Sequence, residues 1–248
     1  MVPGLGDVRA EYRFLAAKLV EAGYRAVTMD LRGHGRSSTG WPDHGCAAIG
    51  SDVVALVAHL DAGPAVLIGT SMGAGAVASA AAEAPAMTAA LVLIGPFVRT
   101  IPPKSRLKGI LQKAMIRIAL AGPWAPGVWG SYYVSLYPTA KPADLDDYRS
   151  ALVKNLGEPG RLAALKAMLA AGRDDIEPRL SEVRAPTLVV MGSKDPDFAD
   201  PAAEAETVAR LLRGTVTMIE GAGHYPHAEM PETTASAVLA FLGREGAR

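Results

Sequence analysis

Residues 69–75 read "GTSMGAG" and place Ser71 between two glycines, directly after the apolar run "AVLI". Gly-x-Ser-x-Gly between a strand and a helix is the nucleophile-elbow pattern. Its turn is sharp, so side chains at Gly69 and Gly73 would collide with the flanking backbone. A glycine-rich strand-to-helix turn with no catalytic function also matches such a short pattern by chance. The heptapeptide alone leaves both interpretations open.

A base and an acid follow later in the chain. A serine becomes a nucleophile near neutral pH when a base takes its proton, and the base needs a partner that fixes its tautomer. After the apolar run "TLVVMG" comes "SKDPDF", with Asp195 and Asp197, and after "TVTMIE" comes "GAGHYPHAE", with His224 and His227. Each residue alone is explained equally well as a turn or surface residue. Together they stand in the order serine, acid, histidine that the elbow arrangement requires, so the sequence predicts a catalytic triad.

The elements that must position these residues alternate along the chain. Short apolar runs, typical of strands buried on both faces of a parallel sheet, occur at 26–30, 65–69, 91–95, 187–192 and 215–220. Amphipathic helical patterns lie between them, at about 12–19, 49–60, 200–213 and from 231 onward. This alternation predicts an α/β fold with a mostly parallel, doubly wound sheet flanked by helices. All three candidate segments then follow strands and meet at one edge of the sheet.

One long segment interrupts the alternation. Residues 97–185 contain helical stretches separated by Pro and Gly, without a convincing strand. Such an insertion is far longer than an ordinary strand-to-helix connection. We expect a helical cap at about 97–185 over the ligand-binding edge of a core formed by residues 1–96 and 186–248. The aromatic side chains of the cap are equally well explained as its own small core or as the lining of a pocket.

At this point the sequence resembles the α/β-hydrolase family over nearly its whole length. The motifs that carry the resemblance are "VPGLGD", "DLRGHGRSS", "GTSMGA", "GSKDPDF" and "GAGHYPHAEMPE". The resemblance implies Ser71 as nucleophile, His224 as general base and Asp195 as acid. Asp195 is preferred to Asp197 because the family's acid usually stands three residues past the strand's glycine, here Gly192. The pattern is most similar to lidded bacterial esterases and cofactor-free haloperoxidase-like hydrolases.

The resemblance also implies an oxyanion hole made by the backbone N–H groups of Leu5 and Met72. We therefore expect hydrolysis of a carboxylic ester or related acyl compound, small or medium and hydrophobic, through an acyl-serine. The same triad also serves perhydrolysis and carbon–carbon bond hydrolysis, and a ligand-binding or signalling protein is a further alternative on this scaffold. No spacing of His, Asp or Glu indicates a metal site, and no glycine-rich loop indicates a nucleotide cofactor.

Composition narrows the classes of partner. Among 248 residues, 25 Lys and Arg balance 25 Asp and Glu, which argues against a nucleic-acid binder. Cys46 is the single cysteine, so no internal disulfide is expected. No signal peptide or membrane span is apparent, and we expect a cytoplasmic protein without a membrane partner. The sequence does not determine the oligomeric state.

The first residues, "MVPGLGD", match the family's oxyanion loop, which normally follows the strand beside the nucleophile strand. No such strand precedes Val2 in this sequence. We therefore expect that Met1 is an internal methionine and that about 20 to 30 residues, a strand and a hairpin, precede it. Without them, the N-terminal strands are missing from the sheet and Leu5 is expected to lack an anchor.

Overall fold

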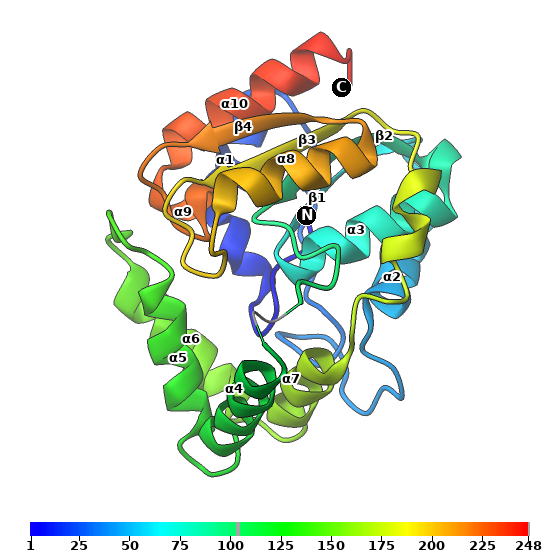
Figure 1. The fold of residues 1–248 in the computed structure, drawn as a ribbon. Coiled ribbons are helices and arrows are strands. Elements are labelled where there is room, and N and C mark those ends of the chain that lie inside the picture. Colours follow the sequence, from blue (N-terminus) through cyan, green and yellow to red (C-terminus); the bar gives the residue numbers. More distant parts are fainter. Residues whose placement is uncertain (103–104, 248) are drawn as a thin grey trace.

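A computed structural model describes residues 1–102 and 105–247. Its centre is a parallel sheet with the strand order β1-β2-β3-β4 (Figure 1). The strands are β1 (Ala65–Thr70), β2 (Thr88–Ile94), β3 (Thr187–Gly192) and β4 (Thr215–Ile219). The two inner strands are apolar and almost fully buried, because helices cover both faces of the sheet.

Helices form a layer on each side. One face packs against α2 (Cys46–Leu60), α3 (Met72–Glu83) and α8 (Pro201–Leu212). The other face packs against α1 (Arg13–Glu21) and α10 (Pro231–Arg244). The remaining short elements are the 3-10 turns Arg9–Tyr12 and Pro85–Met87 and the helix α9 (Pro226–Glu229). The predicted α/β fold class is confirmed by this layered arrangement.

The start of α8 follows from its local sequence. Asp200 has extended backbone angles and its side chain accepts a hydrogen bond from the Ala203 N–H at 3.0 Å. Pro201 occupies the first helical position. A backbone N–H at this position has no acceptor within the helix, so the lack of an N–H in proline costs no hydrogen bond. The helix therefore begins where the cap and the proline predict.

Among the described residues, every regular element of the insertion between β2 and β3 is a helix, and loops connect these helices. It contains α4 (Arg106–Ala119), α5 (Ala125–Ser135), α6 (Leu145–Leu156), α7 (Arg161–Ala170) and the 3-10 helix Glu177–Glu182. The helices α4 to α7 gather at one end of the molecule, below the sheet in Figure 1. Residues 103–104 of the predicted cap and residue 248 of the predicted core lie outside the described part of the chain.

The aromatic residues of the insertion divide between the two roles left open by the sequence. Tyr133, Tyr137 and Tyr148 form a small core with Tyr225 of the sheet domain. Tyr132 lines a large cavity, whereas Tyr133 and Trp129 do both, since Trp129 also packs in a second small core with Leu156 and Leu165.

The predicted strand at 26–30 is wrong. This segment forms no strand, and among the described residues its ladder-type backbone hydrogen bonds are only with Met1. The Met1 N-terminus donates to the Val27 carbonyl at 2.7 Å, and the Met29 N–H donates to the Met1 carbonyl at 3.2 Å. An apolar run becomes a strand only when a neighbour pairs with it over several residues.

On its other side, this N-terminal segment reaches the sheet through Val2. The Val2 N–H donates to the Ile68 carbonyl at 2.8 Å, and the Thr70 N–H donates to the Val2 carbonyl at 3.1 Å. This isolated parallel bridge covers only the last residues of β1. The first half of β1, residues 65–67, borders a cavity of about 440 Å³ that separates it from segment 26–30.

Candidate active site

The elbow around Ser71 has the backbone geometry that its glycines predict. Ser71 has φ 55° and ψ −119°, a strained conformation for a residue with a side chain. A Cβ at Gly69 would lie 2.3 Å from the Gly73 carbonyl oxygen. A Cβ at Gly73 would lie 2.4 Å from the carbonyl oxygens of both Val2 and Pro3. Glycine at both positions therefore lets the nucleophile strand, α3 and the N-terminal segment approach one another.

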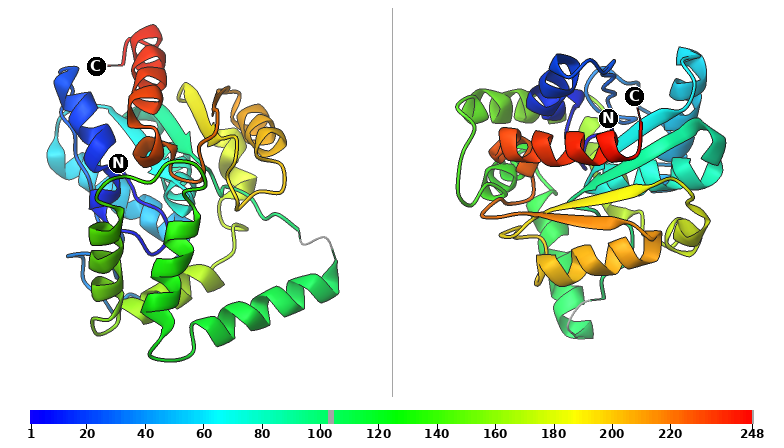
Figure 2. Two further views of the ribbon diagram at one scale, coloured as in Figure 1. Left: turned by 90° about the vertical axis from the view of Figure 1, so that its left-hand side faces the viewer. Right: turned by 90° about the horizontal axis from the view of Figure 1, so that it is seen from above.

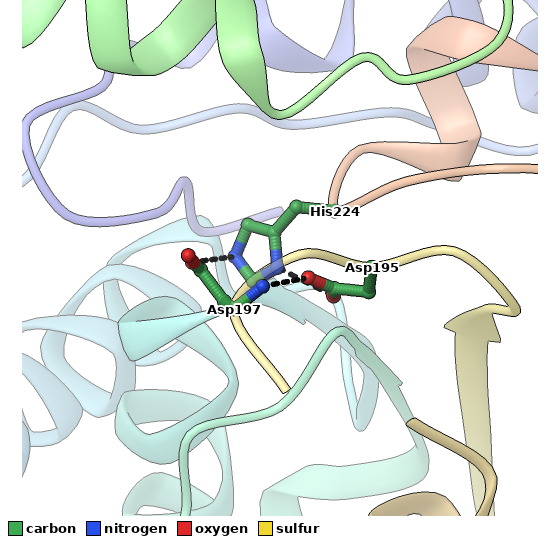
Figure 3. A group of neighbouring side chains, drawn as sticks. All are labelled: Asp195, Asp197 and His224. Atoms are coloured by element: carbon green, nitrogen blue, oxygen red, sulfur yellow. Dashed lines mark hydrogen bonds and ion pairs between the residues drawn. The ribbon is translucent and has the colours of Figure 1, made fainter. Parts of the chain in front are cut away.

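The acid loop and the histidine loop meet at the carboxyl ends of β3 and β4. His224 Nδ1 lies 2.7 Å from Asp195 Oδ2, and both side chains are buried (Figure 3). The two loops touch closely, because a Cβ at Gly192 would lie 2.0 Å from the Gly223 carbonyl oxygen. Asp195 Oδ1 accepts the Asp197 N–H at 3.0 Å, which fixes the orientation of its carboxylate.

Asp197 contacts the opposite nitrogen of the same ring. Its Oδ2 lies 3.8 Å from His224 Nε2, as Figure 3 shows. The Tyr132 hydroxyl, which comes from the insertion, donates to the Asp197 carboxylate at 2.7–2.8 Å. The geometry thus separates the two aspartates that the sequence left as alternatives. Asp195 is placed to orient the ring through Nδ1, whereas Asp197 faces Nε2, the opposite ring nitrogen.

The surroundings of His224 favour its protonated form. Burial on its own lowers the pKa of the imidazole, but the charge and hydrogen bond of Asp195 raise it. The charges of Asp197 and Glu11 raise it further, and the balance places the pKa of His224 at about 9. The free site therefore holds mostly an imidazolium at neutral pH.

Ser71 and His224 open into one cavity of about 800 Å³. Among the hydrogen bonds of the described residues, none joins the Ser71 hydroxyl to His224. The other residues around the cavity are mostly apolar, and the insertion supplies many of them. They include Phe97, Leu111, Met115, Ile116, Leu120, Val128, Trp129, Leu136 and Leu169.

Leu5 and Met72, whose backbone N–H groups are predicted to form the oxyanion hole, line the same cavity. Met72 is the first residue of α3, so its N–H has no acceptor within the helix. In the described part of the chain, the Leu5 N–H has no acceptor either. The loop that carries Leu5 is anchored, contrary to the expectation from the sequence. Its Gly4 N–H donates to the buried carboxylate of Glu11 at 2.7 Å.

Comparison with known proteins agrees with this geometry. Residues 1–237 match the family described as "Alpha/beta hydrolase family". The chain belongs to the alpha/beta hydrolase family. It is 26% identical over 243 residues to a bifunctional esterase/perhydrolase of Acinetobacter calcoaceticus, covering 90% of this chain and 83% of that protein. It is also 30% identical over 258 residues to polyketide synthase ThaQ of Burkholderia thailandensis, covering 98% of this chain but only 12% of that protein.

Solved structures share the fold. A thermophilic esterase from Thermogutta terrifontis superimposes with a TM-score of 0.77 at 24% identity, covering 98% of this chain and 88% of the esterase. At that identity the similarity establishes the alpha/beta hydrolase fold and leaves the substrate open.

In this alpha/beta hydrolase, a buried carboxylate that the sequence analysis did not identify supports the histidine loop. Glu229 accepts the Gly223 N–H at 2.6 Å and the backbone N–H groups of Thr139 and Ala140 at 2.9 and 2.8 Å. The backbone N–H of His224 donates to the backbone carbonyl of Leu136 at 3.1 Å. The insertion therefore helps to position His224. Glu229 lies within the motif "GAGHYPHAEMPE", but its type and spacing gave no sign of this role.

The Asp195, Asp197 and His224 side chains of this alpha/beta hydrolase also offer ligand atoms within 4.8 Å of one another. Sequence spacing gave no sign of this group because the histidine lies far from both aspartates in the chain. A cation held there would compete for the lone pair that His224 needs as a base. The expectation of a metal-free site stays a prediction, which chelation can test.

Proposed function

We propose that the protein is a serine hydrolase that cleaves a carboxylic ester or related acyl compound through an acyl-Ser71 intermediate. The main support is the buried hydrogen bond of 2.7 Å between Asp195 and His224 at the cavity that also contains Ser71. A carboxylate that fixes the histidine tautomer beside an elbow serine is the arrangement that acyl transfer requires.

The proposed reaction begins with neutral His224. Its Nε2 takes the Ser71 proton as the serine oxygen attacks the substrate carbonyl, and Asp195 holds the proton on Nδ1. The N–H groups of Leu5 and Met72 stabilise the tetrahedral oxyanion, and the α3 dipole adds to the Met72 contribution. His224 then gives its proton to the leaving alcohol. In the second half-reaction it takes a proton from a water molecule whose oxygen attacks the acyl carbon. The bond from that carbon to Ser71 Oγ then breaks, His224 returns the proton to Oγ, and the carboxylic acid leaves.

We infer the substrate class from the cavity. Its wall is mostly apolar, with Arg173 and Asp197 among its few charged residues. A volume of about 800 Å³ suits a small or medium ligand. The proposed substrate is a hydrophobic acyl compound without a large polar headgroup.

Labelling with a fluorophosphonate tests the nucleophile. One probe molecule should attach to the peptide "GTSMGAG", and Ser71→Ala should abolish labelling and lower activity by about 10⁴-fold or more. Labelling that persists in Ser71→Ala would overturn the assignment. Rates measured over a series of ester chain lengths, with and without hydrogen peroxide, test the reaction class. Perhydrolysis is the second candidate because the Acinetobacter calcoaceticus relative carries both activities in its name.

A further inference from the structure

Helix α4 exposes apolar side chains on an unusual scale. Leu107 is 66% exposed, Met115 69% and Ile118 69%, and the exposed fractions of Ile110 and Leu111 exceed half. Figure 2 shows in its left-hand view that α4 (green) lies along the lower edge of the molecule, away from the sheet. A contiguous apolar surface of this kind marks an interaction site.

The helix has two apolar sides with different surroundings. Leu111, Met115 and Ile116 belong to the wall of the active-site cavity. Leu107, Ile110 and Ile118 lie outside that wall, and helical spacing gathers their side chains on one face. This second side, the outer face, is therefore not needed to shape the cavity.

A basic strip runs beside the outer face. Arg106, Lys113 and Arg117 follow one another at helical spacing and are all exposed. None of them forms an ion pair with another residue that the structure describes. The surrounding sequence adds to this charge, because residues 84–143 contain no Asp or Glu. The seven basic residues of this segment are Arg99, Lys104, Arg106, Lys108, Lys113, Arg117 and Lys141. Of these, Arg99 forms an ion pair with Glu204, outside the segment. The zero net charge of the whole chain conceals this local excess.

The charge distribution decides between possible partners. A second copy packed symmetrically on the outer face would bring two basic strips together, which is unfavourable. Nucleic acid would match the charge but would leave the apolar face in water. The surface of an anionic bilayer accommodates both, since an interfacial helix buries its apolar face among lipid chains while its Lys and Arg contact the headgroups.

We propose that α4 docks the protein on the surface of an anionic lipid bilayer. The outer face of Leu107, Ile110 and Ile118 enters the interface, and Trp124, which is 56% exposed just beyond α4, lies at headgroup level. Because the other side of α4 forms part of the cavity wall, docking brings the cavity beside the lipid. No described helix is long and apolar enough to cross a membrane, so the contact is peripheral. This proposal departs from the expectation of no membrane partner, which was drawn from the lack of an apparent signal peptide or membrane span in the sequence.

Vesicle flotation with the full chain tests the proposal. The protein should float with vesicles of phosphatidylcholine and phosphatidylglycerol in equal parts, and should remain unbound with phosphatidylcholine alone. Concentrated sodium chloride should weaken the binding because it screens the basic strip. Each basic residue near such a surface strengthens binding about five-fold, so Lys113→Gln with Arg117→Gln should weaken it about 25-fold. Trp124 fluorescence should shift to shorter wavelength on binding.

Replacing apolar residues of the outer face by serine distinguishes docking of this face from attraction by charge alone. Leu107→Ser with Ile118→Ser keeps every charge and should still lose at least ten-fold in binding. The matched control is Val20→Ser with Leu211→Ser, two residues that are 56% and 41% exposed elsewhere, and it should bind as wild type. Absent flotation, equal losses in the control, or a concentration-dependent dimer that Ile110→Ser dissociates would each overturn the proposal. Fluorophosphonate labelling should be unchanged in all of these variants. The docking proposal and the assignment of Ser71 as nucleophile are then tested separately.

Discussion

The position of Asp197 leads to a prediction about pH dependence. Only the neutral imidazole of His224 can take the Ser71 proton, and the pKa of His224 is raised to about 9. At pH 7 roughly 1% of the sites would then hold the base in its active form. The rate of acylation should therefore rise about ten-fold per pH unit and level off above pH 9.

Replacing Asp197 by Asn removes one of the charges that hold this proton. Two unit charges 3.8 Å apart attract by about 1 kcal/mol in water and about 4 kcal/mol at an effective dielectric constant of about 20. At about 1.4 kcal/mol per pH unit, the midpoint should fall by about one to three units. Asp197→Asn should consequently be faster than wild type at pH 7, by about ten-fold or more, while its plateau rate stays within about ten-fold.

The assay is the second-order rate constant for fluorophosphonate labelling between pH 5 and pH 10, because it needs no knowledge of the substrate. Two variants serve as controls. Tyr132→Phe keeps the Asp197 charge and removes only its hydrogen-bond donor, so the midpoint should not fall. Asp195→Asn should lower the rate at every pH by about 10⁴-fold, because the wrong tautomer is stabilised. An unchanged midpoint in Asp197→Asn, or a plateau loss as large as that of Asp195→Asn, would refute the assignment of the two aspartates.

Three further predictions concern stability and metal dependence. Burial raises the pKa of Glu11 from 4.5 to about 7. Between these two pH values the folded protein keeps a proton on Glu11 that the unfolded chain releases. The stability of the wild-type protein therefore falls as the pH rises from 4.5 to about 7. The Tm of Glu11→Gln minus the Tm of wild type should therefore be larger above pH 7 than below pH 4.5. A Tm difference that does not change with pH would contradict this. Gly73→Ala should lower the free energy of unfolding in urea by about 1–3 kcal/mol or more because its Cβ would meet the Val2 and Pro3 carbonyl oxygens. Gly127→Ala is the matched control, since a Cβ there has no neighbour within 4 Å and should cost nothing. Dialysis against EDTA should leave activity unchanged, and a loss that a divalent cation restores would indicate metal binding at Asp195, Asp197 and His224.

Much of the site could be predicted because its signals are local. Residues 69–73 match the elbow pattern, and the Asp and His segments that follow later in the chain made the catalytic interpretation the better one. The apolar runs that come shortly before Asp195 and His224 predict strands, and parallel strands bring their carboxyl ends to one edge. The order of the three segments along the chain was therefore sufficient to predict that they would meet.

The failed strand at 26–30 shows the limit of such reasoning. Its apolar pattern equals that of the observed strands, yet a strand forms only when backbone groups are paired by a neighbour. Within the described chain, Met1 alone provides such pairing, and a cavity occupies the rest of that side. Pattern determines which segments are suited to a sheet, and the neighbouring backbone decides which of them join it.

The tertiary structure alone decided how the site is supported and tuned. Glu229 joins the histidine loop to the insertion through hydrogen bonds with residues 90 and 89 positions away in the sequence. Glu11, only seven residues from Gly4, anchors the loop of Leu5. Tyr132 and Asp197 are 65 residues apart, so no local pattern reveals that their hydrogen bond lies beside His224. The amphipathic pattern of α4 is present in the sequence, but only packing determines whether its apolar side is covered by protein or left exposed. Residue type and spacing determined the chemistry available to this chain, and long-range packing decided the charges and surfaces that surround it.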